Sequence, residues 1–164
     1  MNTRKPTSND LGEPYEVTPK EVIIEKLKLL NLQEGETLID LGCGDARNLI
    51  MAHKLYKVHC IGYELLPKAL QEANENIINE GIAEHIEIKE QSFLEADFSN
   101  ADALILYLTR NSLGQLSLKL ENELPTGTRI VTHDFDIPSW KAEKVIQFKS
   151  KKAIPFTFYL YTKK

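Results

Sequence analysis

The alternation of short apolar runs with segments of helical period is the feature that most restricts the fold of this chain. Five buried strands are predicted, at Thr37–Leu41, Lys57–Tyr63, His85–Lys89, Ala101–Leu108 and Thr128–Thr132. Sequences of helical character separate them. Strands that alternate with helices form a parallel sheet with helices on both faces. The sequence therefore predicts an α/β protein with a doubly wound sheet.

The helix boundaries are marked by residues that favour helix ends. The first helix is predicted to begin at Thr18, whose hydroxyl would cap it, with Pro19 at the first helical position, and to run to about Leu30. Further helices are expected over residues 47–56, from Pro67 to Gly81, and over residues 111–123.

The C-terminal part of the chain breaks the alternation. Lys144–Lys149 and Phe156–Tyr161 are predicted strands joined by a turn too short for a crossover helix, so they form a hairpin and the last strand is antiparallel. No helix fits between the fifth and sixth strands. The expected fold is a mostly parallel seven-stranded sheet over residues 14–164, preceded by a flexible polar arm over residues 1–13.

Composition excludes several classes of protein. The 164 residues are 42% hydrophobic and 27% charged with a net charge of −4, which offers no basic surface for nucleic acid. Two cysteines and four histidines without ligand spacing predict neither disulfides nor a metal site. No apolar run is long enough to cross a membrane, and the N-terminus lacks the apolar core of a secretory signal. We expect a cytoplasmic protein.

A glycine loop follows the first predicted strand. Its sequence, Asp40-Leu41-Gly42-Cys43-Gly44-Asp45-Ala46-Arg47, lets the backbone approach a ligand closely. A dinucleotide site would require a third glycine at position 47, where an arginine stands, so NAD and FAD are disfavoured. We interpret Cys43 as a small loop residue and not as a nucleophile.

Two acids stand at the ends of consecutive strands. Asp40 ends the first strand and suits a cationic ligand, while Glu64 ends the second and can accept hydrogen bonds from two ribose hydroxyls. A ligand with an amine at one end and a ribose at the other fits both, and S-adenosylmethionine is such a ligand. The alternatives are that Asp40 caps the loop and that Glu64 is a surface acid.

With these features the sequence resembles class I S-adenosylmethionine-dependent methyltransferases. It is most similar to small archaeal and bacterial protein-lysine methyltransferases and their mitochondrial relatives that methylate a lysine in ATP synthase. Four segments carry the resemblance: residues 14–22, residues 40–47, residues 104–108, and residues 127–136 together with Trp140. The resemblance implies a Rossmann-like methyltransferase fold. The sequence departs from the family pattern at Ala46, where glycine is usual, at Gln91, where an acid is common, and at Thr109-Arg110, where Leu-Pro is usual.

The resemblance also implies the site and the reaction. S-adenosylmethionine would be the cofactor, S-adenosylhomocysteine the product, and an exposed lysine of a protein the methyl acceptor. Tyr107 is the predicted catalytic residue, orienting the amine. Cofactor binding is predicted for Tyr15, Thr18, Asp40, Gly42, Cys43, Gly44, Glu64, Leu65, Gln91, Ser92 and Tyr107, and substrate binding for His133, Asp134, Asp136 and Trp140.

Each of these roles has a structural alternative. Tyr107 could be a core residue at a strand end, Thr18 a simple helix cap, and Trp140 a residue packed against the hairpin. His133, Asp134 and Asp136 could form a loop that caps the sheet. A small-molecule methyltransferase and a non-catalytic interaction module are the other functions considered, and a nucleic-acid enzyme is disfavoured. We expect a monomer or a weak dimer.

Overall fold

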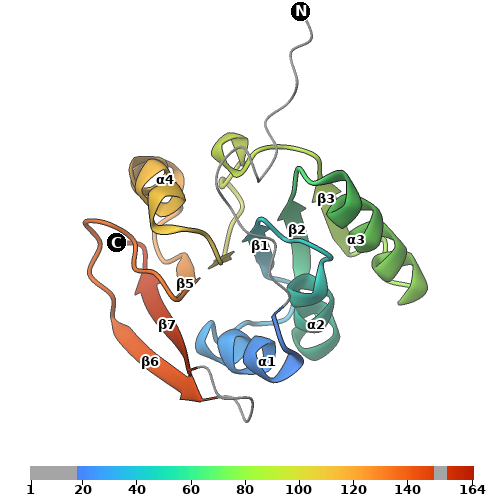
Figure 1. The fold of residues 1–164 in the computed structure, drawn as a ribbon, viewed down its shortest axis with the longest axis horizontal. Helices are drawn as coiled ribbons and strands as arrows, with labels where there is room; N and C mark the ends of the chain where they lie inside the picture. Colours follow the sequence, from blue (N-terminus) through green and yellow to red (C-terminus); the bar gives the residue numbers. More distant parts are fainter. Residues whose placement is uncertain (1–17, 150–154) are drawn as a thin grey trace, which may run out of the picture.

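The computed structural model describes residues 18–149 and 155–164, which form one seven-stranded sheet in the order β3-β2-β1-β4-β5-β7-β6 (Figure 1). The strands are β1 (Thr37–Leu41), β2 (His59–Tyr63), β3 (Ile86–Lys89), β4 (Ala103–Leu106), β5 (Arg129–His133), β6 (Lys144–Lys149) and β7 (Pro155–Thr162). The first five pair in parallel, whereas β7 runs antiparallel to both β5 and β6. The predicted fold is confirmed. The arm expected over residues 1–13 lies outside the described residues.

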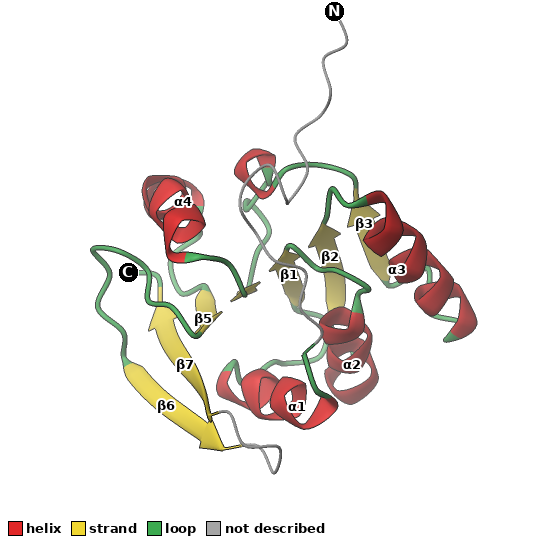
Figure 2. Ribbon diagram, viewed as in Figure 1, coloured by secondary structure: helices red, strands yellow, loops and turns green. Residues whose placement is uncertain are grey.

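Helices cover the sheet on both faces (Figure 2). They are α1 (Lys20–Leu29), α2 (Arg47–Tyr56), α3 (Pro67–Asn79) and α4 (Arg110–Glu123), with a short 3₁₀ helix, η1 (Phe93–Glu95), that sequence reasoning missed. Buried hydrophobic residues of α1, α2 and α3 belong to one cluster, and those of η1 and α4 belong to another. The sheet is therefore the middle of three layers. No helix among the described residues is long and apolar enough to span a membrane.

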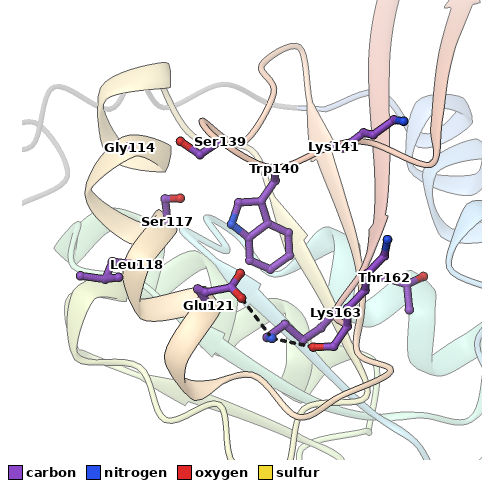
Figure 3. A pocket seen from close by; sticks show the side chains of 10 residues that line it. Gly114, Ser117, Leu118, Glu121, Ser139, Trp140, Lys141, Thr162 and Lys163 are labelled. Atoms are coloured by element: carbon purple, nitrogen blue, oxygen red, sulfur yellow. Dashed lines mark hydrogen bonds and ion pairs between the residues drawn. The ribbon is translucent and has the colours of Figure 1, made fainter.

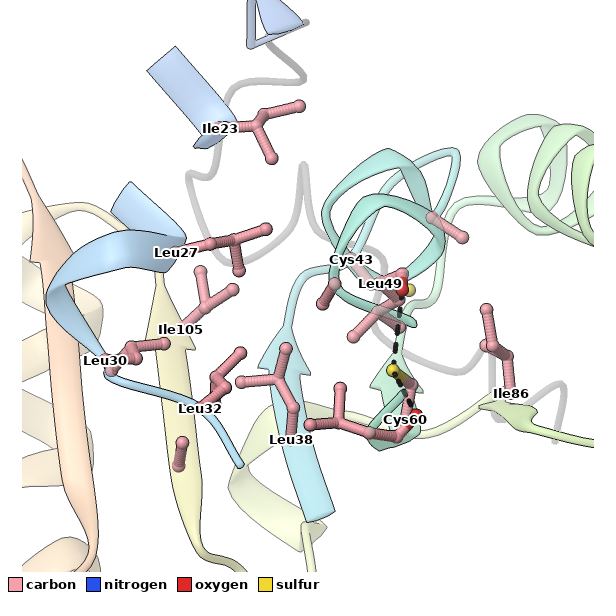
Figure 4. Packing of buried hydrophobic residues seen from close by; sticks show 14 of the residues in the cluster. Ile23, Leu27, Leu30, Leu32, Leu38, Cys43, Leu49, Cys60, Ile86 and Ile105 are labelled. Atoms are coloured by element: carbon pink, nitrogen blue, oxygen red, sulfur yellow. Dashed lines mark hydrogen bonds between the residues drawn. The ribbon is translucent and has the colours of Figure 1, made fainter. Parts of the chain in front are cut away.

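Residue alternation along the strands separates the two clusters. Leu38 of β1 and Ile105 of β4 point toward α1 and α2, where they meet Ile23 and Leu27 (Figure 4). Their neighbours Ile39, Leu104 and Leu106 point toward α4. Because successive side chains of a strand face opposite ways, both layers of helices find an apolar surface on the same sheet.

The N-termini of α1 and α4 are capped in different ways. Thr109 caps α4, since its hydroxyl oxygen accepts a hydrogen bond from Ser112 N at 3.3 Å. The predicted cap of α1 is wrong: Pro19, not Thr18, holds the N-cap position, and its carbonyl accepts from Val22 N at 3.1 Å. Proline at this position leaves Thr18 one residue outside the helix.

Strand β4 is shorter than predicted at both ends. Asp102 lies before it, where its carboxylate accepts from Thr37 N at 2.8 Å and its own N–H donates to the Thr37 carbonyl. Tyr107 and Leu108, which are apolar enough to be predicted as strand, follow the last ladder position at Leu106. The chain therefore leaves the sheet just before the predicted catalytic tyrosine.

Gly62 in the middle of β2 should not tolerate a side chain. A Cβ there would lie 2.6 Å from Cys43 Sγ and 2.9 Å from both Leu49 Cδ1 and Ile88 Cδ1, all of which are packed in the core. We predict that Gly62→Ala lowers the free energy of unfolding by about 1–3 kcal/mol, the usual cost of overpacking. Urea unfolding followed by circular dichroism measures it.

Gly114→Ala is the matched control. Gly114 is exposed on α4, and the nearest atom to an added Cβ is Pro138 Cγ at 3.9 Å. Alanine in a helix interior is favoured over glycine by about 0.5–1 kcal/mol, so this variant should unfold at equal or higher urea concentration. Equal stability of the Gly62→Ala variant and the wild-type protein would contradict the packing around β2.

Candidate active site

The carboxyl ends of the parallel strands meet at one edge of the sheet. In the ladder Asp40 of β1 is level with Ile105 of β4, which is level with Val131 of β5. Tyr107, the first residue after β4, and His133, the last residue of β5, stand two residues after Ile105 and Val131. The glycine loop, Glu64, Tyr107 and His133 therefore gather at the edge where open α/β sheets bind their ligands.

The glycine loop turns sharply between β1 and α2. Gly42 has φ 72° and Gly44 has φ 58°, the left-handed region that glycine adopts without steric cost. The N–H groups of Gly42 and Cys43 both donate to the Tyr63 carbonyl, at 2.8 and 3.1 Å. These bonds tie the loop to the end of β2.

Ala46 takes a third left-handed position in the same loop, with φ 68°. The conformation costs a residue with a Cβ about 1–2 kcal/mol, which explains why glycine would be usual there. Ala46 is completely buried in the cluster under α2, and its N–H donates to the Cys43 carbonyl at 3.0 Å. The loop thus keeps its turn at position 46 without glycine.

Glu64 joins the glycine loop to the start of α3. One carboxylate oxygen, Oε2, accepts from Gly44 N at 2.9 Å, and the other, Oε1, accepts from Leu65 N at 2.9 Å and Leu66 N at 3.0 Å. The side chain is only 5% exposed. Glu64 is therefore buried and is not the surface acid of the alternative interpretation, while its role in binding the cofactor stays a prediction.

Arg47 anchors the loop to the neighbouring helices. Its guanidinium pairs with Asp45, with Nε 2.9 Å from Oδ1, and Nη1 donates to the Thr18 carbonyl at 3.2 Å. Asn76 of α3 donates to the Asp45 carbonyl at 3.1 Å. Arginine at this position therefore holds the start of α1 against the loop.

Asp40 lies beneath the loop, with 1% of its surface exposed. Its Oδ2 accepts from Asn48 Nδ2 of α2 at 2.9 Å. Burial raises the pKa of Asp40 to about 6, although Lys26 and the Asn48 hydrogen bond oppose the shift. The carboxylate is thus placed at the end of β1, as predicted, but inside the protein.

Tyr107 and His133 form a stacked aromatic pair. Their ring centroids are 3.8 Å apart with an interplanar angle of 19°, and Phe156 and Phe158 contact the other sides of the imidazole. Burial, and then the charge of Lys26, lower the pKa of His133 to about 3, so the ring is neutral. Tyr107 is half-buried and lies at the edge of this apolar aromatic group.

The other predicted substrate residues lie apart from one another. Asp134, next to His133, accepts from Thr157 N at 3.0 Å and so closes the end of the β5–β7 pair. Asp136 pairs with Arg110 at 3.4 Å. Trp140 packs edge-on against Tyr161, with ring centroids 6.0 Å apart, in the cluster on the α4 side of the sheet.

The structure therefore brings Asp134 close to the Tyr107–His133 pair but places Trp140 on the opposite face. Trp140 lines a cavity of about 600 Å³ between α4 and the C-terminal residues, where Glu121 and Lys163 also lie (Figure 3). This arrangement agrees with the alternative that Trp140 packs against the hairpin.

The remaining predicted cofactor residues within the described part of the chain belong to the loops that follow β1, β2 and β3. Ser92 is buried and caps η1, accepting from Leu94 N at 3.2 Å, while Gln91 is exposed at the end of β3. Leu65 and Cys43 are buried, and burial raises the pKa of the Cys43 thiol, as expected of a residue that is not a nucleophile. Tyr15 lies outside the described residues.

Lys26 is a residue of this region that sequence reasoning missed. Its side chain is completely buried on α1, and burial lowers its pKa to about 8 against the opposing pull of Asp40 and Asp134. A signal was present, because position 26 stands four residues after Val22 and four before Leu30, inside the apolar stripe of the helix.

Comparison with known proteins decides what kind of site this is. The ANTKMT methyltransferase domain matches residues 40–144, which include the glycine loop, Glu64 and Tyr107. The chain belongs to this methyltransferase family. The predicted resemblance and the prediction of an enzyme are both confirmed.

Similar proteins cover most of this chain. A protein-lysine N-methyltransferase of Saccharolobus islandicus is 35% identical over 90% of this chain and 92% of its own length. An adenine nucleotide translocase lysine N-methyltransferase of Mus musculus is 27% identical over 83% of this chain, which spans 59% of that protein. A crystal structure of an RNA methyltransferase from Salinibacter ruber with S-adenosyl-L-homocysteine has 31% identity and a TM-score of 0.82, covering 90% of this chain and 93% of that one.

The residues of this methyltransferase fit the predicted cofactor. Two buried carboxylates lie at the ends of adjacent strands, and the loop after β1 holds two glycines with left-handed backbone. We predict that Glu64→Ala weakens S-adenosylmethionine binding about 10–100-fold, because charge-assisted hydrogen bonds worth about 1.5–3 kcal/mol are lost. Isothermal titration calorimetry measures the affinity.

Glu90→Ala is the control for this experiment, since Glu90 is an exposed glutamate just after β3. The Glu90→Ala variant should bind S-adenosylmethionine with the affinity of the wild-type enzyme. An unchanged affinity in the folded Glu64→Ala variant would remove Glu64 from the cofactor site.

Proposed function

We propose that this enzyme transfers a methyl group from S-adenosylmethionine to the side-chain amine of a lysine in a protein. The observation that carries the proposal is the stacked Tyr107–His133 pair, whose imidazole is neutral, at the same sheet edge as the glycine loop. Similarity to the Saccharolobus protein-lysine N-methyltransferase over nearly the whole chain supports the same acceptor.

The cofactor would be held by the residues around the loop. Glu64 is assigned to the ribose hydroxyls and Asp40 to the amino group of the methionine moiety, with the glycines giving the backbone room to approach. The full proposed set is Tyr15, Thr18, Asp40, Gly42, Cys43, Gly44, Glu64, Leu65, Gln91, Ser92 and Tyr107. When bound, the cofactor supplies an activated methyl group on a positively charged sulfur.

The acceptor amine must be neutral to attack, yet a lysine in water has a pKa of about 10.4. An amine placed against aromatic rings and away from water loses hydration, which lowers its pKa. Tyr107 can orient that amine through its hydroxyl or its ring face. The enzyme must also align the methyl donor with the acceptor and exclude water. Such alignment can account for much of the rate of an enzymatic reaction.

Tyr107→Phe tests the role of the hydroxyl. We predict that the variant loses methyl-transfer rate about 10-fold or more, as expected when an orienting hydrogen bond is removed, while its affinity for S-adenosylmethionine changes less. Single-turnover rates and calorimetry give the two values. Tyr56→Phe at the end of α2 is the matched control and should behave as wild type.

Rate and affinity that fall together in the Tyr107→Phe variant would make Tyr107 a packing residue. Substitution of His133 is a less useful test, because that side chain is completely buried and its loss would disturb the core.

Incubation with labelled S-adenosylmethionine tests the acceptor itself. The purified enzyme is added to a cell lysate, and labelled proteins are digested and mapped by mass spectrometry. We expect label on lysine side chains. Label on small metabolites alone, or no transfer despite cofactor binding, would contradict the proposal and favour the small-molecule or non-catalytic alternative.

An RNA acceptor is the second candidate, because the Salinibacter protein, 31% identical, is described as an RNA methyltransferase. The net charge of −4 weighs against it, since binding to phosphates needs clustered cations. The same lysate, divided and treated with ribonuclease or protease after labelling, separates the two acceptors.

We also propose that the enzyme works in the cytoplasm, as a monomer or a weak dimer, on proteins that present an exposed lysine. Sedimentation of the purified chain tests the oligomeric state.

A further inference from the structure

Lys26 is a cation buried beneath the candidate site. Its side chain comes from the middle of α1 and is completely buried, and its Nζ makes no hydrogen bond to any residue that the structure describes. Lysines are almost never fully buried unless paired, and burying an unpaired ammonium is energetically costly. This cost indicates that the charge of Lys26 has a role beyond the packing of its side chain.

The groups around Lys26 come from two strand ends and one helix. Asp40 and His133 stand two residues after Leu38 and Val131 on their strands, and these two residues pack in one cluster with α1, the helix that carries Lys26. The charges of Asp40 and Asp134 favour the charged form of Lys26, while His133 is neutral. Asn48 of α2 donates to Asp40, while its own Oδ1 accepts no hydrogen bond from the part of the chain that is described. Lys26 thus faces the layer of polar groups directly under the candidate site.

Asp40 is the predicted cofactor residue on which the charge of Lys26 acts. It is 1% exposed and accepts a side-chain hydrogen bond from Asn48. Burial disfavours the charged form of such a carboxylate, and a nearby cation favours it. The other charged groups that act on Asp40 are Glu64 and Asp45, and both oppose its ionisation.

We propose that Lys26 is a positioning residue that keeps Asp40 ionised, so that Asp40 can accept hydrogen bonds from the amino group of S-adenosylmethionine. The inference rests on the proposed assignment of Asp40 to the cofactor. Lys26 itself acts through Asp40 and needs no contact with the cofactor.

The direction of the pH dependence follows from the charges. Lys26 lowers the pKa of Asp40, which is nevertheless raised by burial to about 6. Replacing Lys26 by a neutral residue therefore raises that pKa further, and Asp40 loses its charge at a higher pH. Cofactor affinity should fall on acidification in both proteins, but should fall earlier in the variant.

The experiment is calorimetric titration of S-adenosylmethionine between about pH 5.5 and 8.5 into wild-type and Lys26→Met proteins. For a rise of about one pKa unit, a typical effect of a nearby charge, the ionised fraction of Asp40 at about pH 6 falls roughly fivefold. We expect the dissociation constant of Lys26→Met to be about fivefold higher at about pH 6 and equal to wild type at about pH 8.5. The ionisation of the ligand is common to both and cancels in the ratio.

Lys28→Met is the matched control on the same helix. Lys28 is exposed and pairs with Glu25, an interaction of little consequence for stability. Its affinity should follow the wild-type curve at every pH. In the Lys26→Met variant, methionine is close to lysine in volume and so preserves the packing. If that variant does not fold, Lys26→Gln is measured in its place.

Two other results would overturn the inference. Equal affinity loss at all pH values would indicate a structural role for Lys26, and a curve identical to wild type would show that its charge does not act on Asp40. Asp40→Asn tests separately whether Asp40 binds the cofactor at all. If that variant binds the cofactor as tightly as wild type, Asp40 is not in the cofactor site, and the role of Lys26 fails with it.

Discussion

The carboxylate of Glu64 is the interaction on which the architecture of the site depends. It accepts hydrogen bonds from backbone N–H groups of two different loops, the one after β1 and the one after β2. These N–H groups stand at turns where the sheet and helix ladders do not pair them. A single buried acid therefore fixes the relative position of two adjacent strand ends, and any ligand bound there meets a surface that is already ordered.

Much of this arrangement could be predicted from the sequence. Strand and helix alternation predicted the parallel sheet, and the parallel sheet places Asp40, Glu64 and Tyr107 at one edge because parallel strands end on the same side. The glycine pattern also predicted a loop after the first strand, and in the structure Gly42 and Gly44 of that loop have left-handed backbone. These inferences needed only local patterns and one rule of topology.

The features that could not be predicted depend on packing between distant segments. Trp140 is close in sequence to His133, but the chain crosses to the α4 side of the sheet in between, and no local pattern shows that crossing. The place of Lys26 in the apolar stripe of α1 could have marked it as buried, but the acids that act on it come from β1 and from the end of β5, which the helix pattern does not show. The cap of α1 was displaced by one residue, a difference that the dihedral angles of Pro19 decide.

The outer strand β6 has a consequence for the behaviour of the protein at high concentration. Among the strands that the structure describes it pairs with β7 alone, so its other edge presents backbone groups to which a strand of another molecule could add. Lys144 and Lys149 stand at its two ends, and the positive charges repel an identical edge. Such placement of lysines opposes aggregation through sheet extension, which would protect the chain without any change to its catalytic edge.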